Sequence, residues 1–458
     1  MRRGPWLATV RPILLALAAG SPAGVAVAGH AAAADIATFG PPEATSSYGK
    51  SIDFRQPVTV TRDLERVEIL IDVEGAPGAE AFEEQLPAAG TTSTTLDHRM
   101  AVSSGALLPN TKLSARWRLT ATDGSVVLGP NVSVTYDDTR FDWKTRTGDL
   151  VRVHWYDGGE AFGQRAMTIG DRAVRETSEL LGVAETEPID FFVYADKNAF
   201  YDALGPGTRE NVGGQANADI RTLFALITPG EIDAAWVGIV IPHELTHLVF
   251  NTAVDNPYHF PPRWLNEGLA VYLSEGYGSS DRSAVEDAAR QGTLIPLGGL
   301  TGQFPTTVDR FSLAYSESVS AVDYLIRQYG KDALVSLIKS YARGLTDDEA
   351  LSGAIGRDTT AFDRAWRDEL NAKDPVVYGP QDASAGPLPP GWSGPAPAAA
   401  ASARPGVNAP SAPSSPSATG AGAGWTIGAV VVVVLIGLLM IGLVLRRQRM
   451  NRPRPPLA

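Results

Sequence analysis

The sequence predicts an α+β fold in which a small mixed sheet is followed by helices and preceded by an all-β sandwich domain. Three observations lead to this prediction. Segments that alternate apolar and polar residues fill residues 36–140, and strand patterns followed by helix patterns fill residues 145–375. The chain of 458 residues is also too long for one ordinary domain, and its 44% of hydrophobic residues can supply two cores.

Residues 36–140 are predicted to form the sandwich. Turn residues such as Asp123 and Gly124 separate short alternating runs, which lie at 58–61, 67–71, 113–119 and 132–136. About a hundred residues of short alternating strands are typical of an immunoglobulin-like or fibronectin type III-like sandwich. Such a sandwich is a candidate surface for a protein partner, although no residue in it identifies the partner.

Residues 145–375 change from strand patterns to helix patterns. Strands are expected at 151–156, 189–194 and 221–228. A helix is expected over 160–181, where Gly182 would end it because glycine adopts the left-handed conformation of a C-cap without strain. After Glu231 nearly every segment has helical character, and the expected helices are 232–252, 264–275, 282–290, 316–329, 332–342 and 359–372.

The composition excludes several kinds of chemistry. The chain has no cysteine, so disulfides and thiolates are absent and any metal must be held by carboxylates and the six histidines. The two chain ends hold eight of the 39 basic residues and none of the acidic ones. The remainder therefore carries 31 basic and 51 acidic residues, a net charge of −20. Such a charge repels phosphates and disfavours nucleic acid as a partner.

The N-terminus has the pattern of an export signal. Residues 1–34 combine an early basic cluster, an apolar stretch and a run of small residues, which predicts a signal peptide cut near Ala34. An uncleaved anchor is the alternative. Near the other end, residues 380–424 are rich in Pro, Ala, Gly and Ser and predict a disordered stalk.

The C-terminus has the pattern of a membrane anchor. Residues 425–445 are 21 consecutive uncharged residues, which at ~1.5 Å per residue is long enough for a transmembrane helix across ~30 Å of hydrocarbon. The basic tail at 446–458 favours the cytoplasmic side. The sequence therefore predicts a single-pass protein of the cell membrane, bacterial in its composition, with one C-terminal membrane helix and its folded domains outside.

One five-residue segment, His243-Glu244-Leu245-Thr246-His247, carries the chemistry. On a helix the two histidines lie one turn apart on the same face, so both imidazoles can bind one Zn²⁺ ion. A catalytic zinc site needs three protein ligands and a water. Glu244 is rotated about 100° from His243, so it can take a proton from that water without being a ligand and is the candidate general base. The alternative is a buried histidine pair that holds no metal.

The stretch from Pro262 to Tyr272 follows this motif and contains the run Trp-Leu-Asn-Glu-Gly-Leu-Ala. With it, the chain resembles the gluzincins, among them the membrane aminopeptidases, and more closely the broader peptidase MA-like domain family. The resemblance covers about residues 145–375. It implies a gluzincin-like catalytic domain with one zinc ion, in which Glu267 is the third ligand; a solvated helix residue is the alternative for Glu267. His259 is interpreted as a structural or substrate-side residue rather than a ligand.

The resemblance also bears on the substrate. Gluzincins bind an extended peptide along the edge strand of their small sheet, which corresponds here to residues 213–226. The Gly-x-Met-Glu-Asn motif with which the aminopeptidases hold a free amino terminus is absent, so exopeptidase activity is unsupported. A downstream helix of the family resembles the stretch from Tyr315 to Tyr324. Tyr315 is the candidate for stabilising an oxyanion through its hydroxyl, and a packing role is the alternative.

Two main functions are compatible with these observations, beside a self-processing or regulatory enzyme that acts on a neighbouring membrane protein. The first is a membrane-anchored, extracytoplasmic zinc endopeptidase that hydrolyses a peptide or protein substrate. The second is a non-catalytic surface protein whose sandwich binds a partner and whose zinc site is structural. Glu244 separates the two, because a structural site needs ligands but no general base.

Overall fold

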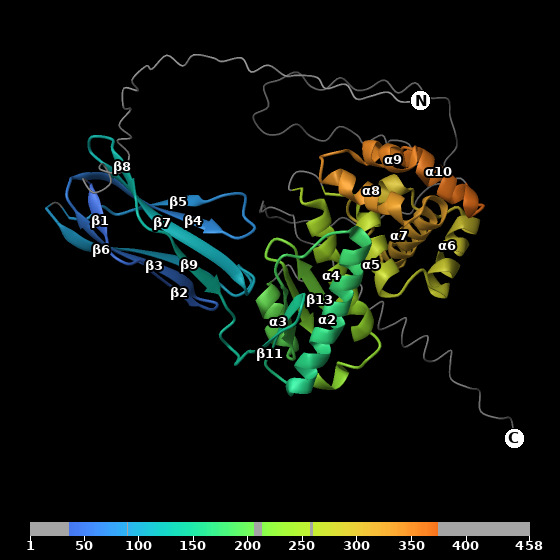
Figure 1. The fold of residues 1–458 in the computed structure, drawn as a ribbon, viewed down its shortest axis with the longest axis horizontal. Coiled ribbons are helices and arrows are strands. Elements are labelled where there is room, and N and C mark those ends of the chain that lie inside the picture. The colour runs from blue at the N-terminus through green and yellow to red at the C-terminus, as the bar shows by residue number, and fades with distance from the viewer. Residues whose placement is uncertain (1–35, 89, 206–212, 257–259, 374–458) are drawn as a thin grey trace, which may run out of the picture. The chain divides into compact units, whose positions relative to one another are not determined.

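The computed structural model describes four stretches of the chain (Figure 1), residues 36–88, 90–205, 213–256 and 260–373. The predicted signal peptide, stalk, transmembrane helix and basic tail lie outside these residues, as does His259.

The described residues form two compact units. The first contains the described residues up to Ser46, together with Ser51–Ala101 and Lys112–Thr135. The second contains the rest, so the short segments Ser47–Lys50 and Val102–Thr111 belong to it although they lie between strands of the first unit in the sequence.

The first unit consists of two sheets. One sheet has the order β1-β3-β2 with β6 also paired to β3, and the other has the order β5-β4-β7-β8 with β9 also paired to β7. The central strands β3 and β7 bury alternate residues along much of their length, and Phe54 and Trp117 are among those inward side chains. The predicted all-β sandwich is therefore confirmed. Its strands are β1 (Ala37–Phe39), β2 (Glu43–Ser47), β3 (Ser51–Val60), β4 (Leu64–Val73), β5 (Glu80–Glu84), β6 (Ser93–Ala101), β7 (Thr111–Ala121), β8 (Val126–Leu128) and β9 (Val132–Tyr136).

The sheet of the second unit is mixed and has the order β10-β11-β12-β14-β13. Its three inner strands are parallel, whereas β10 and β13 pair antiparallel with their neighbours and form the edges of the described sheet. All residues of β12 are buried, which is typical of a parallel strand covered on both faces. The strands are β10 (Lys144–Thr147), β11 (Val151–Trp155), β12 (Ile189–Tyr194), β13 (Gly214–Asn217) and β14 (Thr222–Leu226).

Helices cover both faces of this sheet and continue beyond it, which confirms the α+β arrangement. One face packs on α2 and α4, and alternate residues such as Phe192 and Phe224 pack on α3 from the other face. The helices are α2 (Glu160–Leu181), α3 (Lys197–Leu204), α4 (Val237–Val254), α5 (Arg263–Ser274), α6 (Ser279–Gln291), α7 (Val308–Tyr329), α8 (Lys331–Tyr341), α9 (Asp347–Ile355) and α10 (Thr359–Glu369), with 3₁₀ turns η1 (Pro229–Glu231) and η2 (Leu297–Leu300).

Several helix boundaries follow from local chemistry. Helix α2 ends where predicted, with Gly182 in the left-handed conformation at φ 59°. Helix α4 begins five residues later than predicted, because Pro229 opens a separate 3₁₀ turn that Thr228 and Glu231 cap. Helix α7 begins eight residues earlier than predicted. Helices α3 and α9 were not predicted from the sequence, although Thr346 and Glu349 form a capping box at the start of α9.

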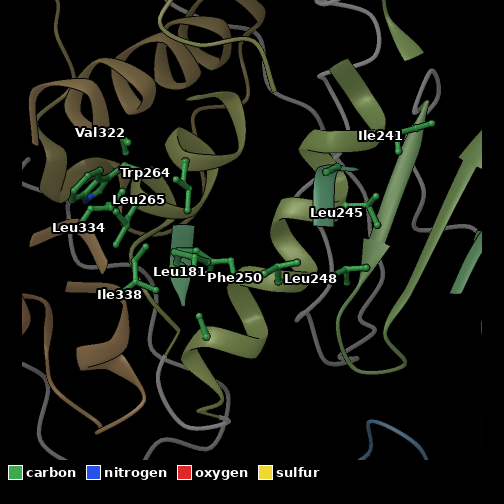
Figure 2. Packing of buried hydrophobic residues seen from close by; sticks show 14 of the residues in the cluster. Leu181, Ile241, Leu245, Leu248, Phe250, Trp264, Leu265, Val322, Leu334 and Ile338 are labelled. Atoms are coloured by element: carbon green, nitrogen blue, oxygen red, sulfur yellow. The ribbon is translucent and has the colours of Figure 1, made fainter. Parts of the chain in front are cut away.

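Helix α4 lies at the centre of the second unit. Its buried residues occur on every side of the helix, as expected for a helix enclosed by other elements. Figure 2 shows Leu245 and Leu248 on the side of α4 nearer the strands, while Phe250 points away from them toward Leu181. Helices α2, α5 and α8 complete the enclosure, so the segment with the zinc motif is held from several directions.

The predicted single-pass membrane location is contradicted. In the part of the chain that the structure describes, no helix is long and apolar enough to cross a bilayer. The longest described helices, α2 and α7, have 22 residues each, but both carry charged side chains, whereas a span needs about 20 predominantly apolar residues. The segment 425–445, on which the prediction depended, lies outside the described residues.

Candidate metal centre

Helix α4 places the two histidines of the motif side by side. Their Nε2 atoms are 3.2 Å apart, and both rings are largely buried. The spacing of four residues brings them onto one face of the helix, and the enclosure of α4 fixes that face. Pro242 lies inside α4 rather than at its start, and its carbonyl accepts a hydrogen bond from the Thr246 hydroxyl at 2.8 Å.

Helix α5 brings Glu267 to the same place. Its Oε2 lies 3.5 Å from Nε2 of His243 and 3.6 Å from Nε2 of His247. Among the described residues, these three form the one group of histidines and acids whose ligand atoms all lie within 4.8 Å of one another. The three residues that the sequence and the resemblance proposed as ligands are thus brought together.

The donor set fits a zinc ion. Bonds of about 2.0–2.2 Å in a tetrahedron place neighbouring ligand atoms roughly 3.4 Å apart, close to the separations found here. Oε2 of Glu267 is also fully buried without a hydrogen-bond partner, which is costly unless a cation approaches it. Two imidazoles and one carboxylate are the ligands of a catalytic zinc site that keeps its fourth position open.

The electrostatic surroundings favour the protonation states that metal ligands need. Burial lowers the pKa of His247 to about 4, so its imidazole is neutral at neutral pH. Burial alone would raise the pKa of Glu267, but its close contacts with His243 and His247 and the charge of Arg263 lower it. Glu267 is therefore a carboxylate.

The ligands have further partners that orient them. Nδ1 of His247 lies 2.9 Å from Oδ1 of Asn266, so the ring donates its Nδ1–H there and turns the Nε2 lone pair toward Glu267. Arg263 donates from Nε to Oε1 of Glu267 at 3.2 Å. Neither Asn266 nor Arg263 was predicted from the sequence to act at the site, although both lie in the segment that carries the resemblance.

Glu244 lies beside the ligand group and faces the edge strand β13. Its Oε2 accepts a hydrogen bond from the backbone N–H of Ala216 at 3.2 Å. Burial, and then the charge of Glu267, raise the pKa of Glu244 well above its usual range, so its carboxylate is a stronger base than that of an exposed glutamate. Gly214 permits this close approach, because a Cβ there would lie 3.1 Å from Cγ of Glu244.

Tyr315 comes to the centre from α7. Its hydroxyl lies 3.5 Å from a terminal guanidinium nitrogen of Arg263, and its ring packs against Phe304 and Phe311. Burial, and then the charge of Glu267, raise the pKa of Tyr315 well above its usual range, so the phenol stays protonated and can donate a hydrogen bond. Tyr315 therefore packs against its neighbours and also lies near the candidate ligands, so a packing role and a role in stabilising an oxyanion are compatible.

A glycine allows α5 and α7 to approach closely. A Cβ on Gly268 would lie 2.4 Å from the carbonyl oxygen of Ser318, which is closer than any side-chain carbon can come. Because Gly268 follows Glu267 in the chain, this contact sets the distance between the third candidate ligand and the helix of Tyr315.

Comparison with known proteins agrees with this centre. The family model of the Peptidase MA superfamily matches residues 170–372, a segment that contains the zinc motif and Glu267. The match confirms the family resemblance predicted from the sequence. No curated protein matches the chain.

Solved structures also align with the chain. An aminopeptidase N family protein from Idiomarina loihiensis aligns at 11% identity over 74% of this chain and 76% of its own, with a TM-score of 0.39. An M1 zinc metallopeptidase from Deinococcus radiodurans aligns at 14% identity over 75% of this chain and 94% of its own, with a TM-score of 0.34.

Proposed function

We propose that this chain, in which residues 170–372 form a domain of the Peptidase MA superfamily, is a zinc metallopeptidase that cleaves bonds within a peptide or protein chain. One observation carries the proposal. Two histidines and a carboxylate converge at distances that suit zinc, and a further carboxylate, Glu244, lies beside them without belonging to the ligand group.

The proposed reaction gives each of these residues a role. When bound by His243, His247 and Glu267, zinc would activate a water and polarise the carbonyl of the substrate. Glu244 takes a proton from the attacking water and transfers it to the leaving amine, and its raised pKa suits a group that must hold that proton briefly. Tyr315, kept protonated by its surroundings, donates a hydrogen bond to the oxygen that becomes negative.

The edge strand β13 supports an extended substrate. In the described sheet β13 pairs only with β14, so its other edge is available for backbone pairing with a peptide. The hydrogen bond from Ala216 ties Glu244 to this strand, so a peptide paired there would run past the general base. The sequence of β13, Gly-Gln-Ala-Asn, holds no acid that could bind a free amino terminus, which favours an endopeptidase.

The test uses the full chain loaded with zinc and a library of peptides blocked at both ends. Wild type is expected to cleave internal bonds, and Glu244→Gln is expected to lower the rate about 10²–10⁴-fold while its zinc content stays the same. Glu317→Gln is the matched control, because Glu317 is an equally buried glutamate of α7 outside the centre and its substitution should leave the rate unchanged.

Three outcomes would contradict the proposal or part of it. If zinc-loaded wild type cleaves no member of the library and no unblocked peptide, the chain is not a peptidase. That result would favour the alternative of a non-catalytic surface protein with a structural zinc site. Cleavage by Glu244→Gln at the wild-type rate removes the general base from the mechanism. Cleavage confined to peptides with a free amino terminus shows an aminopeptidase instead of an endopeptidase.

A further inference from the structure

Arg263 is a buried cation beside the metal centre, and the proposed reaction gives it no role. It is the first residue of α5, one helical turn before Glu267, and only 8% of its surface is exposed. A guanidinium is costly to bury unless it is paired, and the first turn of a helix disfavours a positive charge. Helix stability therefore does not explain why an arginine occupies this position.

The Arg263 guanidinium contacts residues of both α5 and α7. Its Nε donates to Oε1 of Glu267 at 3.2 Å, and a terminal nitrogen lies 3.5 Å from the hydroxyl of Tyr315. Its Cζ lies 4.3 Å above the ring of Phe304, within the range of a cation–π contact. The same side chain therefore contacts the third candidate ligand on α5 and the candidate oxyanion donor on α7.

The contact with Arg263 gives the two oxygens of the Glu267 carboxylate different surroundings. Oε1 accepts the hydrogen bond from Arg263, whereas Oε2 has no hydrogen-bond partner and faces His243 and His247. A guanidinium bonds at fixed angles, so it restrains the plane of the carboxylate as well as its position.

We propose that Arg263 is a positioning residue that presents Oε2 of Glu267 alone to the zinc ion and, through its second contact, orients the hydroxyl of Tyr315. The inference rests on the proposed function as far as zinc and Tyr315 are concerned. Partners that restrain a ligand in this way usually change metal affinity or activity 10–100-fold when they are removed.

A second arginine provides a matched control. Arg327 pairs with Asp323 at the same spacing of four residues, in α7, with a separation of 2.8 Å. Its side chain is 46% exposed, and the Asp323 carboxylate is outside the metal-ligand group. Arg327→Gln therefore removes a helical arginine–carboxylate pair without touching the centre.

The experiment measures zinc affinity by competition with a chromogenic chelator, and the visible spectrum of the Co²⁺-substituted full chain. Arg263→Gln is expected to weaken zinc binding about 10–100-fold and to shift the Co²⁺ bands, whereas Arg327→Gln should change neither. Arg263→Lys keeps the charge but not the fork of donors, so it should retain most of the affinity and still shift the bands. The proposal would be overturned if the zinc affinity of Arg263→Gln were within twofold of the wild-type affinity and its Co²⁺ bands were unchanged.

Kinetics test the second contact. Arg263→Lys should lower kcat more than it raises KM, and combining it with Tyr315→Phe should add little to the loss caused by Tyr315→Phe alone. Fully additive losses would contradict a role through Tyr315. If wild type binds zinc but cleaves no peptide, the proposed function fails, while the affinity and spectral results still decide how Arg263 acts on Glu267. If Arg263→Gln does not fold, the spectrum of Arg263→Lys decides, and unchanged bands there contradict the proposal.

Discussion

Two of the buried polar clusters in the second unit differ in how completely their atoms are paired. The carboxylate of Asp138, on a segment before β10, accepts hydrogen bonds from the Arg140 guanidinium and the Tyr194 hydroxyl, and both of its oxygens are used. At the metal centre Oε2 of Glu267 has no hydrogen-bond partner, and Glu244 receives one backbone N–H. Full pairing is what a buried charge needs for stability, so the incomplete pairing identifies the atoms that a ligand would contact.

The largest effect is expected from breaking the paired cluster. Asp138→Ala leaves the buried Tyr194 hydroxyl without its acceptor and removes two hydrogen bonds from the Arg140 guanidinium, which keeps Asp202 and the Ala199 carbonyl as acceptors. The free energy of unfolding should fall by about 2–4 kcal/mol. Urea unfolding of the metal-free protein measures this. The exposed neighbour Asp142 is the control, since Asp142→Ala should stay within about 0.5 kcal/mol of wild type. A loss below 1 kcal/mol for Asp138→Ala would contradict the conclusion that full pairing of this cluster stabilises the fold.

The Glu317 carboxylate is intermediate between these two clusters, because it is buried and only partly paired. Both oxygens of Glu317 share the single N–H of Ile295, at 3.1 Å each, and burial raises the pKa of Glu317 to about 8. Because the folded protein keeps this proton at pH values where the unfolded chain has lost it, the free energy of unfolding should fall as the pH rises from about 4.5 to about 8.

The glutamine variant isolates this dependence. Glu317→Gln cannot titrate, so its stability relative to wild type should increase with pH over that range, by up to about 4 kcal/mol. Denaturant unfolding of both proteins between pH 5 and pH 8.5 measures the difference. A constant difference across the range would show that Glu317 is ionised throughout and is better paired than its contacts indicate.

The smallest effect on stability is expected from a substitution at the contact between α5 and α7. It tests whether helix packing, in addition to polar pairing, positions the candidate metal ligands. Gly268→Ala pushes α5 away from the backbone of α7, which should cost about 1–3 kcal/mol and weaken zinc binding. Gly353→Ala, in α9, meets no atom within 4 Å and should stabilise by roughly 0.5–1 kcal/mol with zinc affinity unchanged. Equal zinc affinity in the two variants would show that the spacing of α5 and α7 is irrelevant to the metal.

Local patterns predicted the parts of the molecule that depend on neighbouring residues. The spacing of His243 and His247 is decided within one helix, and Gly182 ends α2 through its own conformation, so both could be read directly from the sequence. The all-β character of the first unit followed from alternating residues in the same way.

What the sequence could not supply depends on packing between distant segments. The contact of Tyr315 with Arg263 requires α7 to lie against α5, and the hydrogen bond from Ala216 to Glu244 requires an edge strand to pass over α4. Asn266 is different, because it adjoins Glu267 and could have been recognised as a partner of a histidine. The predicted single-pass membrane location is contradicted, because no helix among the described residues is long and apolar enough to cross a bilayer.

The enclosure of α4 has a kinetic consequence for the centre it carries. Buried residues on every side of this helix leave no route by which it can detach alone, so the amide protons of residues 243–247 should exchange with solvent only when the whole unit opens. The two candidate histidine ligands therefore lie on the slowest-exchanging part of the unit. A metal ion bound there would therefore dissociate no faster than the residues around it open locally.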